Sequence, residues 1–139
     1  MQLKIKKLKP DAVIPSYAHP GDAGLDLHSL EDCEIKPNER KVFYLGFAME
    51  MPTGYVALVK DRGSMAQAGI HTIAGVVDSS YRGEYMCLVI NLDNKPYQIK
   101  KGDRLAQLLI MPLVQADIEE VDELSTTSRG EGRLGSSGK

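Results

Sequence analysis

Short alternating or apolar runs, each closed by a turn signal, divide residues 2–114 and constrain the fold more than any other feature of the chain. Residues 2–6 (QLKIK) alternate polar and apolar side chains, which is the period of a β-strand. Further strand-like runs are 41–51, 55–60, 70–77, 84–92 and 104–114, separated by the turn-forming segments KPN, PTG, SS, DNKP and KGD. Only residues 64–68 favour a helix, and it would be short. Short strands at this spacing predict an antiparallel, all-β sandwich or barrel.

The composition changes after Val114 and predicts two parts within the chain. The length of 139 residues suits one domain. The segment QADIEEVDEL carries five carboxylates, and the residues after it are polar and rich in Gly and Ser. We therefore expect a β domain over residues 1–122 and a flexible arm over residues 123–139, with the acidic run as a solvated edge strand. By composition alone, the final TTSRGEGRLGSSGK is typical of a flexible linker.

Charge and hydrophobicity exclude several classes of partner. The formal net charge of −2 provides no basic field for nucleic acid or an anionic membrane surface. The chain has no apolar run of about 18 residues, and the N-terminal MQLKIKKLKP lacks the apolar block of a signal peptide. Cys33 and Cys87 lie far apart and are expected as two reduced thiols in a cytoplasmic protein.

Motifs for transition metals and for the nucleotide-binding P-loop are missing from the sequence. The histidines His19, His28 and His71 follow no metal-binding spacing, and neither HExxH nor CxxC occurs. No GxxxxGK[ST] segment is present. Any chemistry must therefore come from loops that carry charge and glycine beside the apolar strands.

Residues 75–84 (GVVDSSYRGE) place Asp78 at the end of an apolar run, before a turn and a second apolar run. This order predicts a β-hairpin with Asp78 at its mouth. Two interpretations of Asp78 stay open. Its carboxylate can cap neighbouring amides as a turn former, or it can act as a catalytic group.

Two other loops combine charge with small residues. Arg62 ends a strand-like run and precedes Gly63 and Ser64, so it can hold an anion together with main-chain amides, or lie exposed as a surface arginine. Residues 102–107 (GDRLAQ) lead into a buried strand and predict a hairpin corner with a local Asp103–Arg104 pair.

Five short motifs, taken in order, resemble those of the homotrimeric, all-β deoxyuridine triphosphatase (dUTPase) family. The resemblance covers residues 23–138, through AGLDL (23–27), RGSM (62–65), GVVD to YRGE (75–84), GDRLAQL (102–108) and RGEG to GSSG (129–138). It implies a jelly-roll-like β-barrel or sandwich subunit that forms a homotrimer with shared active sites. In that family the C-terminal arm closes over the site of a neighbouring subunit.

The resemblance implies Mg2+-dependent hydrolysis of dUTP to dUMP and pyrophosphate, which keeps uracil out of DNA and supplies dUMP. Asp78 matches the general base, since an ordinary carboxylate is ionised at pH 7 and can take a proton from the water that attacks the α-phosphorus. Gln107 matches a residue near the α-phosphate and that water. Arg62 and Arg129 would offset the charge of the triphosphate, and Asp26 would meet Mg2+ through water.

The same resemblance places the nucleoside at the third motif. Backbone groups of residues 76–86 would match the acceptor–donor–acceptor edge of uracil, which cytosine does not share. The ring of Tyr81 would pack under the deoxyribose and leave no room for a 2′-hydroxyl. The implied substrate-binding residues also include Thr72, Val76, Val77 and Met86.

Two positions depart from the family's motifs and predict a reduced rate. Gly63 stands where Ser is usual, and losing one hydroxyl donor near the leaving oxygen costs about 10^2 to 10^3 in rate. Leu134, after Arg133, stands where Phe usually covers the uracil, which loses stacking of about 1 to 3 kcal/mol. Other small residues remain as expected phosphate ligands, namely Ser64, Gly135, Ser136 and Ser137.

Two alternative functions stay open. A regulatory or binding protein with this fold and weak catalysis would fit Gly63 and Leu134. A dCTP deaminase-type enzyme shares the fold, but its chemistry needs a general acid/base, usually Glu, on the strand after the hairpin. Here that strand reads MCLVI (86–90) and carries no carboxylate.

Overall fold

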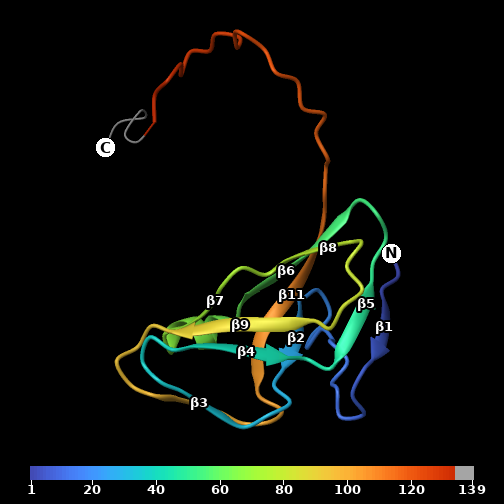
Figure 1. The fold of residues 1–139 in the computed structure, drawn as a ribbon, viewed down its shortest axis with the longest axis vertical. Helices are drawn as coiled ribbons and strands as arrows, with labels where there is room; N and C mark the ends of the chain where they lie inside the picture. Colours follow the sequence, from blue (N-terminus) through green and yellow to red (C-terminus); the bar gives the residue numbers. More distant parts are fainter. Residues whose placement is uncertain (134–139) are drawn as a thin grey trace.

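The computed structural model describes residues 1–133, and these residues form an almost entirely β structure (Figure 1). The elements are β1 (Lys4–Lys7), β2 (Gly24–His28), β3 (Cys33–Ile35), β4 (Arg40–Tyr44), β5 (Phe47–Glu50), β6 (Tyr55–Asp61), α1 (Gly63–Gln67), β7 (Ile70–Thr72), β8 (Val76–Asp78), β9 (Met86–Asn91), β10 (Tyr97–Ile99) and β11 (Arg104–Pro112). Over this range no helix has the length and apolar character needed to cross a membrane.

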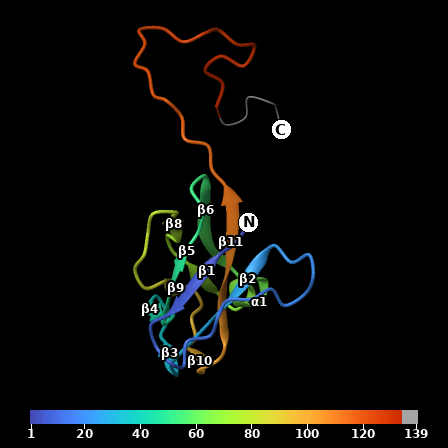
Figure 2. The same cartoon turned by 90° about the vertical axis from the view of Figure 1, so that its right-hand side faces the viewer.

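The strands form two larger sheets and two strand pairs. One sheet has the order β2-β11-β6-β8, the other has the order β4-β9-β7, and the pairs are β1-β5 and β10-β3. All strand pairings among the described residues are antiparallel. The predicted all-β, antiparallel, jelly-roll-like fold is therefore confirmed, and Figures 1 and 2 show the larger sheets from two directions.

The hydrophobic core takes alternate residues from both larger sheets. In β2, Leu25 and Leu27 are buried, while Asp26 between them faces away from the core. In β9, the buried residues Cys87 and Val89 likewise alternate with more exposed residues. Because successive side chains of a strand point to opposite faces, this alternation turns the polar residues of β2 outward.

Left-handed backbone interrupts two of the predicted runs. Residues 41–51 divide into β4 and β5 at Gly46, whose φ is +71°, and residues 70–77 divide into β7 and β8 at Ala74 (φ 60°) and Gly75 (φ 98°). A residue with positive φ cannot continue an extended strand. The strands β2, β3 and β10 form in segments for which the sequence predicted none, and the predicted helix at residues 64–68 is present as α1.

Residues 113–133 leave the body as an extended arm (Figures 1 and 2). The last strand ends at Pro112, ahead of the boundary predicted near residue 122, and Leu113 N–H donates to the carbonyl of Gly54 at 2.8 Å. Residues 115–124 form no strand, so the prediction of an edge strand for the acidic run is wrong. Their direction away from the body leaves them no sheet edge to pair with, and Ile118 is 96% exposed.

Candidate functional site

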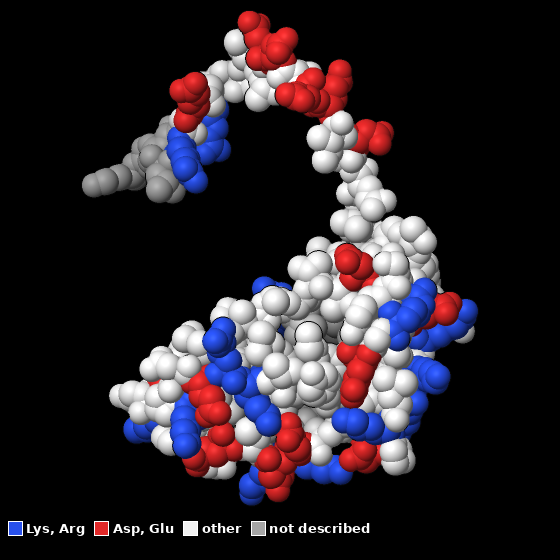
Figure 3. All heavy atoms as spheres, in the orientation of Figure 1, with Lys and Arg blue, Asp and Glu red and all other residues white. Residues whose placement is uncertain are grey.

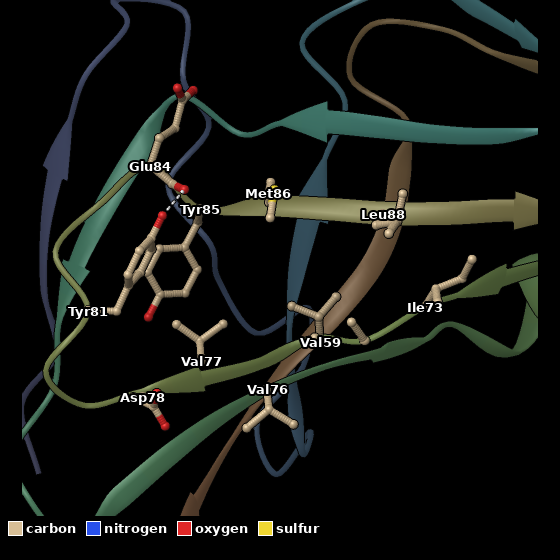
Figure 4. Close-up of a pocket in the computed structure, with 12 residues that line it drawn as sticks. Val59, Ile73, Val76, Val77, Asp78, Tyr81, Glu84, Tyr85, Met86 and Leu88 are labelled. Atoms are coloured by element: carbon tan, nitrogen blue, oxygen red, sulfur yellow. Dashed lines mark hydrogen bonds between the residues drawn. The ribbon is translucent and has the colours of Figure 1, made fainter.

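A pocket lies between β8 and β9, the strands on either side of the third motif (Figure 4). This β8–β9 pocket has a volume of about 270 Å3, and the apolar side chains of Val59, Ile73 and Leu88 line one end of it. Tyr81 and Asp78 lie at the other end. Five of the residues predicted to form the site line this pocket, namely Val76, Val77, Asp78, Tyr81 and Met86.

The predicted hairpin between these strands is wrong, and its absence is what opens the pocket. β8 pairs with β6 in one sheet, whereas β9 pairs with β4 and β7 in the other. The turn at residues 79–85 therefore crosses from sheet to sheet. β8 is an edge strand, and its outer edge faces β9 across the pocket.

The main chain of β9 presents polar groups to the β8–β9 pocket. Ile73 N–H donates to the carbonyl of Leu88 at 2.9 Å, so the main-chain groups of Leu88 point towards Ile73, on the β7 side of β9. Met86, two residues earlier, points its N–H and C=O the same way, because this direction alternates along a strand. β7 pairs with β9 up to Val89, and the bond from Ile73 reaches Leu88 just beyond it. Within the described chain, no strand pairs with this edge of β9 at Met86. A planar ligand with matching donors and acceptors can pair there.

Tyr81 forms a fixed aromatic wall of the pocket. Its hydroxyl donates to the carbonyl of Glu84 at 3.1 Å, and its ring lies 6.0 Å from the ring of Tyr85, which stacks on Phe47 at 5.3 Å. Gly83 allows this position, since a Cβ there would lie 2.5 Å from Cζ of Tyr81. The hydroxyl of Tyr85 is buried without a partner among the described residues, and burial raises the pKa of Tyr85 to about 12.

Asp78 ends β8 opposite Val56 and is exposed. The turn after it is closed by the main chain, where Tyr81 N–H donates to the carbonyl of Asp78 at 3.1 Å. Over residues 1–133 the Asp78 carboxylate has neither a hydrogen-bond partner nor an ion pair, as the bonds of its neighbours Ser79 and Arg82 do not reach it. Its side chain is therefore not needed to form the turn, which favours the catalytic interpretation.

A second, polar pocket surrounds Asp26 on the outer face of β2. In this Asp26 pocket, Asp26 pairs with Arg62 Nε at 3.1 Å and with Arg104 Nη1 at 3.3 Å. Arg62 Nη1 also donates to the carbonyl of Arg104 at 3.2 Å. Asp22 also lines this pocket, but its carboxylate accepts from the main-chain N–H of His19 at 2.8 Å, so the two guanidinium groups gather around Asp26 and can hold an anionic ligand there. Arg62 is thus held in the pocket, with 24% of its side chain exposed, and is not a simple surface arginine.

The prediction of a local Asp103–Arg104 pair is wrong, because Arg104 pairs with Asp26. The Asp103 carboxylate instead accepts from the main-chain N–H of Lys100 at 2.8 Å, as is usual in a tight turn. Arg104 is free to reach across to Asp26 because β11 and β2 are neighbouring strands. The sequence did not single out Arg104 as a site residue, although its place at the start of the fourth motif is the signal that could have identified it.

Gln107 lies between Gly24 and Asp61 in the Asp26 pocket. Its Nε2 donates to the main-chain carbonyl of Asp61 at 2.8 Å. A Cβ added at Gly24 would lie 2.8 Å from Cβ of Gln107, so glycine is required for the two strands to hold this side chain between them. Gly63 and Ser64, at the start of α1, line the same pocket.

Thr72 lies beneath Asp61 and gives it both of its donors. Its main-chain N–H and its hydroxyl each approach Oδ1 of Asp61 at 2.6 Å, and Nδ1 of His71 lies 2.6 Å from Oδ2. Burial raises the pKa of Asp61, but the bonds from Thr72 and His71 outweigh it, and the pKa falls below its ordinary value. Thr72 therefore has no free donor for a ligand in this structure.

The two pockets lie apart within one chain. Asp78 stands opposite Val56 and Gln107 stands opposite Lys60, on opposite sides of β6. Four residues along a strand span about 13 Å at roughly 3.3 Å per residue. The chain thus brings Asp26, Arg62 and Gln107 together, and groups Asp78 with Tyr81, but does not join the two sets.

The remaining predicted residues belong to the arm. Arg129 is exposed there, with Nε donating to the carbonyl of Gly132 at 2.9 Å. The arm itself extends away from the body (Figures 1 and 2). The predicted residues Leu134, Gly135, Ser136 and Ser137 lie outside the described residues.

A divalent metal fits the Asp26 pocket only through water. Among residues 1–133, no group of three or more His, Cys, Asp or Glu side chains is arranged to hold a metal ion. The carboxylate of Asp26 is already shared between two arginines. Mg2+ keeps several waters and often takes its other ligands from substrate phosphates, so an outer carboxylate such as Asp26 is a suitable partner for it.

Comparisons with known proteins agree on one family. The dUTPase family model matches residues 10–138. The chain is 49% identical to a deoxyuridine 5'-triphosphate nucleotidohydrolase of Nautilia profundicola over 142 residues, which cover 100% of both chains. It is similar to a mutant dUTPase of Staphylococcus bacteriophage 80alpha with dUpNHpp, with a TM-score of 0.92, 28% identity and 99% of each chain covered. It is also similar to a mutant dUTPase from phage phi11 of S. aureus, described with a structural Mg(II) ion, at a TM-score of 0.84 and 25% identity over 91% of this chain and 100% of that one.

The lowered pKa of Asp61 predicts a stability difference at acid pH. A carboxyl group whose pKa is lowered by folding stabilises the folded state above its unfolded pKa, and this contribution is lost as pH falls through the folded pKa. Below about pH 4, the Tm of the wild type should fall more steeply than that of Asp61→Asn, which has no such proton to take up. Calorimetry from pH 7 to pH 2 measures this, with Asp117→Asn in the exposed arm as a control that should follow the wild type. Equal slopes for the wild type and Asp61→Asn would contradict the assignment.

Proposed function

The chain belongs to the dUTPase family and is a dUTP diphosphatase, and we propose how its residues hydrolyse dUTP to dUMP and pyrophosphate. In this proposal Asp78 activates the attacking water, Mg2+ is the cofactor, and three copies of the chain share their sites. The observation that carries the proposal is the carboxylate of Asp78, which has no partner among residues 1–133, beside a pocket where no described strand pairs with the main chain of Met86. The enzyme would act in the cytoplasm, keeping uracil out of DNA and supplying dUMP, and its two free thiols, Cys33 and Cys87, fit a reducing compartment.

Uracil would be recognised by the main chain of the β8–β9 pocket. The N–H of Met86 can donate to a uracil carbonyl, and its C=O can accept from the N3–H, as in the addition of a further strand. Cytosine has an acceptor at N3, so its N3 would face the carbonyl of Met86 without a hydrogen bond. A buried mismatch of this kind can discriminate by roughly 10^4.

The deoxyribose would rest against Tyr81. The ring is held by Glu84, by Tyr85 and by the space that Gly83 leaves, so it cannot move aside easily. A fixed aromatic face in contact with the sugar leaves no room for a 2′-hydroxyl. The position of Tyr81 therefore supports selection of dUTP over UTP.

The triphosphate would bind in the Asp26 pocket. Phosphate oxygens would bind the guanidinium groups of Arg62 and Arg104 in place of Asp26. The carboxylate of Asp26 would then be available to hold a metal ion through water. Mg2+, when bound, would neutralise part of the charge on the phosphate oxygens. The structural Mg(II) ion described for the phi11 relative supports a divalent cation in this family.

Asp78 would take the proton from the water that attacks the α-phosphorus. Its carboxylate is exposed at the end of β8 and has no partner within the described chain, so it can accept a proton without breaking an existing bond. Gln107 would orient the same water or the α-phosphate from the Asp26 pocket. Positioning and charge stabilisation then supply most of the rate enhancement, with no covalent intermediate.

A homotrimer is supported by the separation of the two pockets. Asp78 and Gln107 cannot meet one α-phosphate within a single chain, but the Asp26 pocket of one copy can face the β8–β9 pocket of another. The arm supports the same arrangement, because it extends away from its own body. Figure 3 shows its acidic stretch followed by basic residues, and the sequence has three cations, Arg129, Arg133 and Lys139, against one carboxylate side chain, Glu131, over residues 129–139. A positive arm tip suits closure over the triphosphate in a neighbouring subunit, for which Leu134 to Ser137 would supply the remaining contacts.

Gly63 would lower the catalytic rate below that of a chain with Ser at this position. A Cβ added at Gly63 meets no atom within 4 Å, so the position has room for the hydroxyl that the family usually carries there. Its absence removes one donor near the leaving oxygen, which Ser64 in the same pocket replaces only in part.

A regulatory role is the second candidate. The 80alpha relative belongs to phage dUTPases that are described as controlling the transfer of virulence genes by a proto-oncogenic G protein-like mechanism. The similarity to that structure supports a nucleotide-dependent binding role for this chain in addition to hydrolysis. A dCTP deaminase-type activity has no such support, since β9 carries no carboxylate.

Replacing the general base tests the proposed mechanism. Asp78→Asn should lower kcat for dUTP at least about 10^3-fold while the affinity for dUTP stays within about tenfold, because the amide cannot take a proton but fills the same space. Pyrophosphate release is measured with dUTP, dCTP, dTTP and UTP, and the wild type should act on dUTP alone. Full activity of Asp78→Asn would remove Asp78 from the mechanism, and an inactive wild type would remove the proposed hydrolysis.

Restoring the missing hydroxyl tests the role of Gly63. Gly63→Ser should raise kcat about tenfold with KM within about threefold, since a donor at the leaving oxygen acts mainly in the transition state. Gly63→Ala is the control, because it adds the Cβ without the hydroxyl and should not raise kcat. An equal response of both variants would show that the hydroxyl is irrelevant.

A further inference from the structure

The carboxylate of Asp61 ties the two larger sheets together at one end of β6. Asp61 is the last residue of β6, in the sheet β2-β11-β6-β8, and Thr72 is the last residue of β7, in the sheet β4-β9-β7. The N–H and the hydroxyl of Thr72 both bond to one carboxylate oxygen at 2.6 Å. Charge-assisted bonds of this kind are about twice as strong as neutral ones. The end of β6 is therefore fixed in position relative to the other sheet.

The main-chain carbonyl at this fixed end determines the orientation of the Gln107 carboxamide. A carbonyl can only accept, so it selects the Nε2 end of Gln107, which donates to it at 2.8 Å. The Oε1 end then lies towards Gly24, whose added Cβ would meet Oε1 first. Among residues 1–133, one N–H of Nε2 and the lone pairs of Oε1 remain for a ligand in the Asp26 pocket. Without the anchor, the carboxamide could turn and exchange its donor and acceptor ends.

We propose that Asp61 is a positioning residue for the hydrolysis of dUTP, and that Thr72 and Asp61 together hold Gln107 in the orientation that addresses the attacking water or the α-phosphate. This inference rests on the proposed function, because Gln107 acts on the substrate only there. It also gives Thr72 a role different from the predicted substrate contact, since both of its donors are used by Asp61.

His71 contributes less than Thr72 to this arrangement. Its Nδ1 lies 2.6 Å from Oδ2 of Asp61, but its side chain is 53% exposed, compared with 23% for Asp61. Solvent screens an exposed pair, and such pairs contribute little to stability. The chain of contacts that matters therefore runs from Thr72 through Asp61 to Gln107.

A double-mutant cycle on the full-length enzyme tests the proposal. Gln107→Ala should lower kcat for dUTP about 10^2-fold, and Asp61→Ala about tenfold, each with KM within about threefold. The double variant should have the kcat of Gln107→Ala within about twofold, because a residue that acts through Gln107 has no further effect once Gln107 is gone. Circular dichroism and solution mass are recorded first, so that only folded protein of wild-type mass is compared.

Thr72 supplies milder variants in case Asp61→Ala does not fold. Thr72→Val removes the hydroxyl donor and should lower kcat about fivefold in the wild-type background and not at all in the Gln107→Ala background. Thr72→Ser keeps the hydroxyl and should restore the rate. Asp32→Ala is the matched control: Asp32 also accepts a main-chain N–H across the chain, from Lys101 at 2.7 Å, but away from the Asp26 pocket. It should change Tm without changing kcat.

Two outcomes would overturn the proposal. Additive losses from Asp61→Ala or Thr72→Val in the Gln107→Ala background would show that these residues do not act through Gln107. Loss of Tm without loss of kcat in Asp61→Ala would show a purely structural role. Failure of the proposed function is distinct from both, since it would appear as a wild type that does not release pyrophosphate from dUTP.

Discussion

The pairing of β6 with β11 on one side and β8 on the other determines where the polar residues of both pockets lie. It holds Asp78 opposite Val56 near one end of β6 and Gln107 opposite Lys60 near the other. A shift of one residue in either pairing would turn the shifted strand's side chains to the opposite face. The same ladder therefore gives each pocket its residues and keeps the two pockets about 13 Å or more apart in a single chain.

The β8–β9 pocket exists because two strands that are neighbours in the sequence belong to different sheets. An unpaired strand edge is usually a liability, and at this pocket it consists of the short β8 and one end of β9. Tyr81 is fixed on this framework, so the pocket is organised before the proposed nucleoside would enter, and binding would need little further ordering.

The sequence predicted the antiparallel β fold, most strands and the short helix, since period-two patterns and turn signals are local. It could not predict that β8 and β9 would separate, because pairing partners depend on contacts far apart in the chain, and positive φ at Ala74 leaves no clear trace in composition. Most of the described motif residues predicted for the site divide into the two pockets, whereas Thr72 lines neither pocket and Arg129 lies in the arm. The partners that hold them, Arg104 for Asp26 and Asp61 for Gln107, come from neighbouring strands, and only the three-dimensional register brings them together.

Subunit complementation tests the central claim, that one active site combines the Asp26 pocket of one subunit with the β8–β9 pocket of another. Arg62→Ala and Asp78→Asn are each prepared as inactive proteins, then unfolded, mixed in equal amounts and refolded together. If sites are shared between subunits, about a quarter of them regain both residues, and dUTP turnover returns to about a quarter of the wild-type rate. If each site lies within one chain, every site lacks one residue, and a mixture as inactive as its two parents would contradict the account.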